Sequence, residues 1–210
     1  MASLTASDRR KLFLGDAQAP GGLRIYALGD IHGRSDCLAD MLELIERDCD
    51  ASACERRRII FLGDYADRGP DSRGVIEQLL QLSSSPDFLC LRGNHDDWLL
   101  DFLSHPEDGD RFLYWGGRET LTSYGVDLRA DCSNERLSRE LMRRMPDEHR
   151  RFLARLRHSH VEGDYFFCHA GVRPGIALDQ QDPHDLLWIR GEFNQHQDSF
   201  GKVVVHGHTP

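Results

Sequence analysis

The stretch RRIIFLGDYADRGP, residues 57–70, joins an apolar run to a polar turn. Its isoleucine and phenylalanine residues favour a buried strand, and the Gly63-Asp64 pair ends that strand. A similar arrangement precedes it at LRIYALGD (23–30) and follows it at DFLCLRGNHD (87–96), with helical periods of apolar residues between the runs. Alternating strands and helices predict an α/β fold whose sheet is largely parallel and covered by helices.

The chain divides into segments of different character. Residues 1–22 are polar and then rich in Ala, Gly and Pro, so we expect a flexible N-terminal lead-in before a domain over 23–210. Arg- and Glu-rich helical patterns predict an inserted helical cap at approximately 106–157. Strands are expected to resume at 164–172 and 202–209, with a loop between them.

Composition excludes several classes of partner. The chain has 26 basic and 35 acidic residues and a formal charge of -9, which disfavours a broad electrostatic surface for nucleic acid or an anionic membrane. Signal-peptide and membrane-span patterns are missing, and the six cysteines form no CxxC pair. We therefore expect a cytoplasmic protein with reduced thiols, whose oligomeric state its sequence does not indicate.

Each expected strand ends in a short polar cluster. In open α/β sheets, ligands bind beyond the carboxyl ends of the strands, where several loops converge. One shared site is therefore predicted from five clusters: GDIHG, GDYADRG, RGNHD, CHAG and HGHT.

The polar clusters supply metal-ligand types. Asp30 and His32 flank Ile31, so an extended strand end would place both side chains on one face. The other candidate ligands are Asp64, Asn94, His169 and His208. This mixture of oxygen and nitrogen, without thiolate, predicts two divalent ions, with manganese favoured over iron or zinc. Asp64 is the natural bridge, and a hydroxide shared by the two ions would attack phosphorus in line.

Arginines in the same clusters indicate a phosphate substrate. Arg68, Arg92 and Arg190 offer planar guanidinium groups that match phosphate oxygens at two points. His95 is expected to protonate the leaving oxygen, while Asp67 orients its imidazole and raises its pKa. The predicted chemistry is metal-dependent phosphoester hydrolysis.

In their order along the chain, GDIHG, GDYADRGP, GNHD, one His after an apolar strand and GHT resemble the calcineurin-like metallophosphoesterases, and within them the PPP-type bacterial serine/threonine phosphatases. The resemblance implies a four-layer αββα sandwich. It implies that Asp30, His32 and Asp64 hold the first metal, while the second is held by Asp64, Asn94, His169 and His208.

The resemblance also raises a question about the chain end. Similar proteins continue past GHTP with strands of the second sheet, so the sequence predicts that those strands are missing and the chain is truncated at Pro210. We then expect His208 to lie on a fraying end and the second metal to be weakly held.

Three functions remain open at this point. The first is hydrolysis of phosphoserine or phosphothreonine in phosphoproteins. The second is hydrolysis of dinucleoside polyphosphates, such as diadenosine tetraphosphate, or of another small phosphate ester. The third is a noncatalytic metal-binding or scaffold protein. A P-loop enzyme is disfavoured because GxxxxGK[ST] does not occur.

Several polar and aromatic residues have simpler interpretations. Trp115 and Tyr124 are expected to pack in the core or the cap, and His206 to be structural. Helix capping rather than metal binding is expected of Asp36, Asp71, Asp96 and Asp97.

Overall fold

The computed structural model describes residues 14–52, 55–128 and 133–209. Most of the predicted N-terminal lead-in, residues 1–13, lies outside them. Its remainder forms a short 3₁₀ turn, η2 (Leu14–Asp16), and then lies against a later strand connection. There the Gln18 backbone N–H donates to the Asp164 carboxylate at 3.2 Å, and the Asp164 N–H donates to the Gln18 carbonyl at 3.0 Å.

The first sheet is parallel, as the alternation of strands and helices predicts. Its order is β1 (Leu23–Leu28), β2 (Arg56–Phe61) and β3 (Phe88–Cys90). Helices α1 (Ser35–Ala51) and α2 (Ser72–Leu82) connect these strands. The α2 helix begins at a true cap, because the Asp71 carboxylate accepts from the Gly74 N–H at 2.9 Å.

The second sheet combines two directions. Strands β4 (Ser159–Glu162) and β5 (Tyr165–Cys168) form an antiparallel pair, and β6 (Val203–Val205) lies parallel to β5. The sequence predicts β5 and β6 but not β4, because β4 reads SHVE and lacks an apolar run. The expected loop before β6 instead contains η5 (Leu178–Gln180), α8 (Pro183–Trp188) and α9 (Gly191–Asn194).

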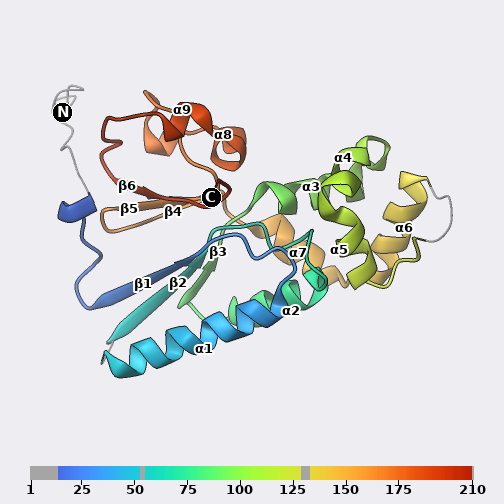
Figure 1. The fold of residues 1–210 in the computed structure, drawn as a ribbon, viewed down its shortest axis with the longest axis horizontal. Helices are drawn as coiled ribbons and strands as arrows, with labels where there is room; N and C mark the ends of the chain where they lie inside the picture. Colours follow the sequence, from blue (N-terminus) through green and yellow to red (C-terminus); the bar gives the residue numbers. More distant parts are fainter. Residues whose placement is uncertain (1–13, 53–54, 129–132, 210) are drawn as a thin grey trace.

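The two sheets pack face to face between layers of helices (Figure 1). Side chains of β2 alternate between the layers: Ile59 and Phe61 pack with α1 and α2, while Ile60 packs with Phe167 of the second sheet. Helices α8 and α9 lie over the outer face of the second sheet (Figure 1). The predicted αββα sandwich is therefore confirmed, with a short second sheet.

The part of the chain between β3 and β4 is mostly helical. They are α3 (Asn94–Ser104), η3 (Pro106–Asp108), α4 (Asp110–Phe112), the π-helical turn η4 (Leu113–Gly117), α5 (Arg118–Ser123), α6 (Asn134–Arg144) and α7 (Asp147–Arg155). Helices α4 to α6 lie beyond the ends of the strands (Figure 1). Their buried residues, including Leu121 and Leu141, join the same apolar cluster as Phe61 of β2. Among the described residues, no helix is both long and apolar enough to cross a membrane.

Candidate metal centre

Loops from both sheets meet beyond the carboxyl ends of their strands. The loop after β1 is joined to the loop after β2, because the Asp64 carbonyl accepts from the N–H groups of Ile31 at 3.1 Å and His32 at 2.8 Å. The last loop is joined to the second sheet, since the Gly207 N–H donates to the His169 carbonyl at 2.8 Å. These bonds bring the predicted polar clusters to one place.

The backbone of this place is unusually strained. Among the described residues, the non-glycine residues with positive φ are His32 (43°), Asp64 (57°), Asp67 (72°), Arg68 (65°) and His208 (63°). All of them are residues that the sequence predicts for the site. Left-handed backbone costs about 1–3 kcal/mol for such residues and gathers at functional positions.

Two predicted ligands reach the site by a different route from the one expected. Strand β1 ends at Leu28, so Asp30 and His32 lie in the following loop and not on an extended strand. The predicted placement of both side chains on one face of a strand end is therefore wrong. His32 has a left-handed backbone, with a φ of 43°, and its Nε2 lies 3.9 Å from Asp30 Oδ2.

The Asp64 loop is supported by a buried carboxylate that the sequence identifies only as a helix cap. Asp96 Oδ2 accepts from the N–H groups of Asp64 and Gly93, each at 2.9 Å, and Oδ1 accepts from Tyr65 at 2.9 Å and Ala66 at 3.4 Å. Burial raises the pKa of Asp96 to about 7, while these backbone donors oppose the rise.

Glycine is required where the two loops touch. A Cβ added at Gly93 would lie 2.1 Å from the Asp64 nitrogen, and one at Gly63 would lie 2.3 Å from the Gly93 nitrogen. The Gly63 backbone also has a φ of 107°. This close approach sets the Asp64 carboxylate above the start of α3.

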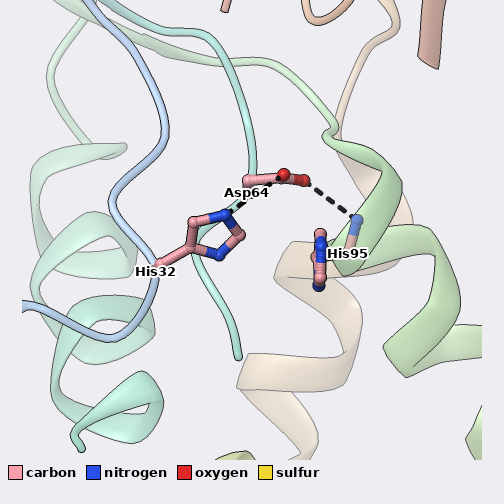
Figure 2. Close-up of side chains that lie close together, drawn as sticks. All are labelled: His32, Asp64 and His95. Atoms are coloured by element: carbon pink, nitrogen blue, oxygen red, sulfur yellow. Dashed lines mark hydrogen bonds and ion pairs between the residues drawn. The ribbon is translucent and has the colours of Figure 1, made fainter. Parts of the chain in front are cut away.

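Asp64 is shared by two groups of residues that are able to hold a metal ion. One group contains His32, Asp64 and His95, and the other contains Asp64, His169 and His208; the ligand atoms within each lie within 4.8 Å of one another. Figure 2 shows the first group, with Asp64 between the ring of His32 and the backbone of His95. Asp64 Oδ2 lies 3.5 Å from His32 Nε2 and 3.4 Å from His169 Nε2.

Two of the imidazoles turn Nε2 toward Asp64. His32 Nδ1 lies 2.8 Å from the Ala66 carbonyl, and His169 Nδ1 lies 3.0 Å from the Leu62 carbonyl. A carbonyl accepts only, so each Nδ1 carries the proton and each Nε2 keeps its lone pair toward Asp64. The Asn94 side-chain oxygen approaches the same His169 Nε2 at 2.8 Å.

The side chains in the two groups do not supply a positive charge that would balance the Asp64 carboxylate. Burial, together with the charges of Asp96 and Asp30, raises the pKa of the Asp64 carboxyl well above its usual range. Burial also lowers the pKa of His32 and His169 to about 4 and that of His208 to about 3, so these rings are neutral near pH 7. Neutral imidazoles around a buried carboxylate fit divalent cations, whose charge would offset the cost of burial.

His208 is held from several directions. It is 9% exposed, its N–H donates to Asp30 Oδ1 at 3.0 Å, and its Nε2 accepts from Arg190 Nε at 3.0 Å. The Trp188 ring meets it edge to face at 6.1 Å. The expectation of a fraying His208 is therefore not what the structure shows. The side chain of His206 packs against Phe193, with the two rings edge to face and 4.9 Å apart, as expected of a structural residue.

His95 and Asp67 form the pair that the sequence predicts, with a different charge balance. His95 Nδ1 lies 2.7 Å from Asp67 Oδ2, and the Thr120 hydroxyl donates to Asp67 Oδ1 at 2.6 Å. Burial, reinforced by the Arg68 guanidinium, lowers the pKa of His95 to about 3. Burial raises that of Asp67 to about 8. We expected Asp67 to raise the pKa of His95, but burial and Arg68 lower it, and the opposing attraction comes from Asp30.

The three predicted arginines are placed differently. Arg68 lies inside the site, where its guanidinium nitrogens contact His32 Nε2 at 2.8 Å and His95 Nε2 at 2.9 Å. Arg190 is exposed beside His208. Arg92 bonds the α7 carbonyls of Leu153 and Ala154 at 3.2 and 3.0 Å, as well as Asp97 at 3.1 Å, and so ties α7 to α3.

Sequence reasoning overlooks an aromatic cluster beside the site. The rings of Trp98 and Trp188 lie 4.6 Å apart, and the Arg111 guanidinium sits over both at 4.7 and 5.3 Å. Trp98 also contacts the His95 ring at 5.0 Å. Lone tryptophans in helical patterns give no signal for such a cluster, since core packing explains them equally well.

The two aromatic residues assigned to packing have opposite outcomes. Tyr124 is 2% exposed and its hydroxyl bonds His149 at 2.8 Å, so the packing interpretation is confirmed. Trp115 is 48% exposed, so that interpretation is wrong for it. The η4 turn breaks helical geometry at Trp115 and so leads its ring out of the core.

The family model of the calcineurin-like phosphoesterases matches residues 23–210. The chain belongs to that family. As a calcineurin-like phosphoesterase it is a hydrolase of the metallophosphoesterase class, a class that uses divalent metals.

Two curated relatives of this calcineurin-like phosphoesterase are named bis(5'-nucleosyl)-tetraphosphatases. Bis(5'-nucleosyl)-tetraphosphatase PrpE [asymmetrical] of Oceanobacillus iheyensis is 28% identical in an alignment 214 positions long, which covers 90% of this chain and 78% of the relative. A symmetrical bis(5'-nucleosyl)-tetraphosphatase of Acidovorax sp. is 34% identical over 158 residues, which cover 75% of this chain and 47% of the relative. The match thus spans most of the first relative but only about half of the second.

A solved structure shows the same fold. It is provisionally named a diadenosine tetraphosphatase, is 21% identical, and aligns with a TM-score of 0.56 over 88% of this chain and 74% of its own.

Proposed function

We propose that the chain hydrolyses dinucleoside polyphosphates at a centre of two divalent cations. The carrying observation is that buried Asp64 is shared by two ligand groups beside Arg68. The sequence alone favoured phosphoproteins as substrates. The names of the relatives, bis(5'-nucleosyl)-tetraphosphatases, support dinucleoside polyphosphates instead.

We assign the ligands by their position around Asp64. Asp30 and His32 would complete the first site. Asn94, His169 and His208 would complete the second. When bound, the two cations would lower the pKa of water and neutralise phosphate charge. Manganese is our proposed metal, with iron or zinc as alternatives, because the donors are oxygen and nitrogen without thiolate.

The remaining residues of the site would handle the substrate. Arg68 already has its guanidinium between the metal ligand His32 and the proposed acid His95, where it would bind and orient a phosphate. Arg190 would do the same at the His208 side. His95 is held by Asp67 through Nδ1, and its Nε2 faces the cluster, where it accepts from Arg68. A phosphate bound by Arg68 would free Nε2 to take a proton from water and pass it to the leaving oxygen. Arg92 has an indirect role in our proposal: it donates to carbonyls at the end of α7 and so holds that helix in place.

The test compares substrates on one metal-loaded preparation. Manganese-loaded protein is incubated with diadenosine tetraphosphate, a panel of phosphoserine and phosphothreonine peptides, and p-nitrophenyl phosphate, and the products are separated by chromatography. We expect nucleotide products from the tetraphosphate and a rate above that of the peptides. Activity restricted to the peptides would contradict the substrate proposal. If no substrate were hydrolysed with any of the metals, the proposal that the protein is an enzyme would be contradicted, and a noncatalytic scaffold would be favoured.

Matched variants separate the centre from general effects of lost charge. Asp64→Asn should lower turnover roughly a hundredfold or more, because it weakens both ligand groups together. Asp36→Asn is the control, since its carboxylate is exposed and pairs with Arg34 at 2.7 Å. Equal turnover of the two variants would refute the assignment of Asp64.

A further inference from the structure

Two neighbouring aromatic side chains of the η4 turn are exposed to solvent. Tyr114 is 80% exposed and Trp115 is 48% exposed, and their rings meet edge to face at 5.2 Å and 88°. The other large apolar side chains that are exposed in the described part of the chain are aliphatic: Met41, Leu44, Met142, Val161 and Ile176. Adjacent exposed aromatic rings on a folded surface are typical of a ligand contact.

The η4 turn is built against the candidate phosphate site. The Arg68 N–H donates to the Gly116 carbonyl at 3.1 Å, and a Cβ at Gly116 would lie 2.5 Å from the Arg68 nitrogen. The same arginine reaches His32 and His95 through its guanidinium. Trp115 is therefore the direct neighbour of Gly116, whose carbonyl is bonded to the backbone of Arg68, the residue proposed to bind phosphate.

The turn has a tightly packed base, which fixes the backbone that carries the two rings. Phe112, just before it, is 2% exposed and stacks on Phe102 at 4.7 Å. Gly117 packs so closely on Phe112 that an added Cβ would lie 2.5 Å from its ring. Between these anchors, Gly116 takes a φ of 115°, which only glycine adopts readily. A backbone fixed in this way lowers the entropy that is lost on binding.

We propose that Tyr114 and Trp115 form a stacking platform for the nucleobase of the substrate. This inference rests on the proposed function, in which the substrate is a dinucleoside polyphosphate. A phosphate bound at Arg68 carries its nucleoside into the adjacent space, and every nucleobase has a flat face that stacks on aromatic rings. A phosphoserine side chain has no such face at a fixed distance from its phosphate.

The other aromatic group near the site is less suited to a base. Trp98 and Trp188 contact one another, and the Arg111 guanidinium already covers both rings. Their contacts with His95 and His208 make them supports of the proposed ligands and acid. The rings of Tyr114 and Trp115 instead remain open to solvent.

The experiment compares two inhibitors that share a triphosphate group, only one of which carries a nucleoside. ATP and inorganic tripolyphosphate are titrated against hydrolysis of p-nitrophenyl phosphate by the manganese-loaded full chain. Stacking is worth about fivefold to a hundredfold in affinity, so wild type should bind ATP more tightly than tripolyphosphate by roughly that factor. The double variant Tyr114→Ala/Trp115→Ala should lose about tenfold of this preference and keep its inhibition constant for tripolyphosphate.

Two further variants control the result. Trp115→Phe should retain most of the preference for ATP, because an aromatic face remains. Ile176→Ala removes a 43% exposed aliphatic side chain outside the turn and should leave both inhibition constants unchanged. An unchanged ATP preference in the double variant would overturn the platform. Equal weakening of both inhibitors would also overturn it, since the turn would then act only by supporting Arg68.

The two proposals fail in distinguishable ways. If wild type cleaves diadenosine tetraphosphate but the double variant keeps its ATP preference, the platform is wrong and the proposed function stands. If the ATP preference depends on the two rings but the tetraphosphate is not cleaved, the platform stands and the substrate proposal is wrong. A wild type that binds ATP and tripolyphosphate equally contradicts the platform directly.

Discussion

Replacing Asp96 by Asn should loosen the centre from beneath. The Asp96 carboxylate accepts four backbone N–H groups, from Asp64, Gly93, Tyr65 and Ala66. An amide keeps one oxygen and turns its nitrogen toward two of these donors, which it cannot accept. The variant therefore loses two hydrogen bonds to a charged acceptor and leaves two buried N–H groups unpaired.

The magnitude follows from those two bonds. Each hydrogen bond to a charged group contributes about 1.5–3 kcal/mol, so their loss costs about 3–6 kcal/mol. Removing a carboxylate that is 0% exposed offsets part of this, because burial disfavours its charge. We expect the free energy of unfolding to fall by about 2–4 kcal/mol. We also expect turnover to fall, since the Asp64 backbone is no longer held.

Urea unfolding followed by circular dichroism measures the change in free energy, with Asp97→Asn as the matched control. Asp97 lies next along α3, has a 43% exposed side chain and pairs with Arg92 at 3.1 Å, so its loss should cost no more than about 1 kcal/mol. If the two variants were equally stable and equally active, the support assigned to Asp96 would be refuted.

Three further outcomes are expected. Manganese at about a hundred times its dissociation constant should raise the Tm of wild type by roughly 5–10 °C in a thermal-shift assay, and a similar rise in Asp64→Asn would contradict the ligand assignment. The Arg173 guanidinium, 2.5 Å from both carboxylate oxygens of Asp185, lowers the pKa of that carboxyl. Its contribution should be complete at pH 6 and fade below about pH 4, so the Tm difference between wild type and Asp185→Asn should shrink with acid; a pH-independent difference would exclude this pairing effect. Burial raises the pKa of Cys168 to about 12 while Cys37 is exposed, so iodoacetamide at pH 8 should label Cys37 and spare Cys168 in the native protein, as peptide mass spectrometry would reveal; labelling of Cys168 at a comparable rate would contradict its burial.

The fold was accessible from sequence where apolar runs and polar turns repeat. Residues 57–70 predict β2 and the turn after it, because a buried strand between two layers needs apolar side chains on both faces. Strand β4 lacks that signal. It pairs with β5 through backbone groups, and its edge position requires few apolar side chains.

The site was accessible in residue type more than in geometry. Asp64, His169 and His208 were identified by their place after apolar strands, and the structure brings their ligand atoms within 4.8 Å of one another. The direction of Arg92 toward α7 depends on a helix far along the chain, and no local pattern encodes it. Asp96 lies in the first turn of a helix, where a capping function explains it and hides its bonds to the Asp64 loop.

The sequence did not indicate the strained, left-handed backbone of the site. Glycine would adopt the left-handed backbone of His32, Asp64, Asp67, Arg68 and His208 at little cost, yet each position has a side chain able to bind a metal, a phosphate or a proton. The strain at each costs about 1–3 kcal/mol, so packing for stability alone disfavours these residues. Bonds from elsewhere hold the strained loops, including those from Asp96 and Thr120. The chemistry of the site therefore accounts for the residues at these five positions better than stability does.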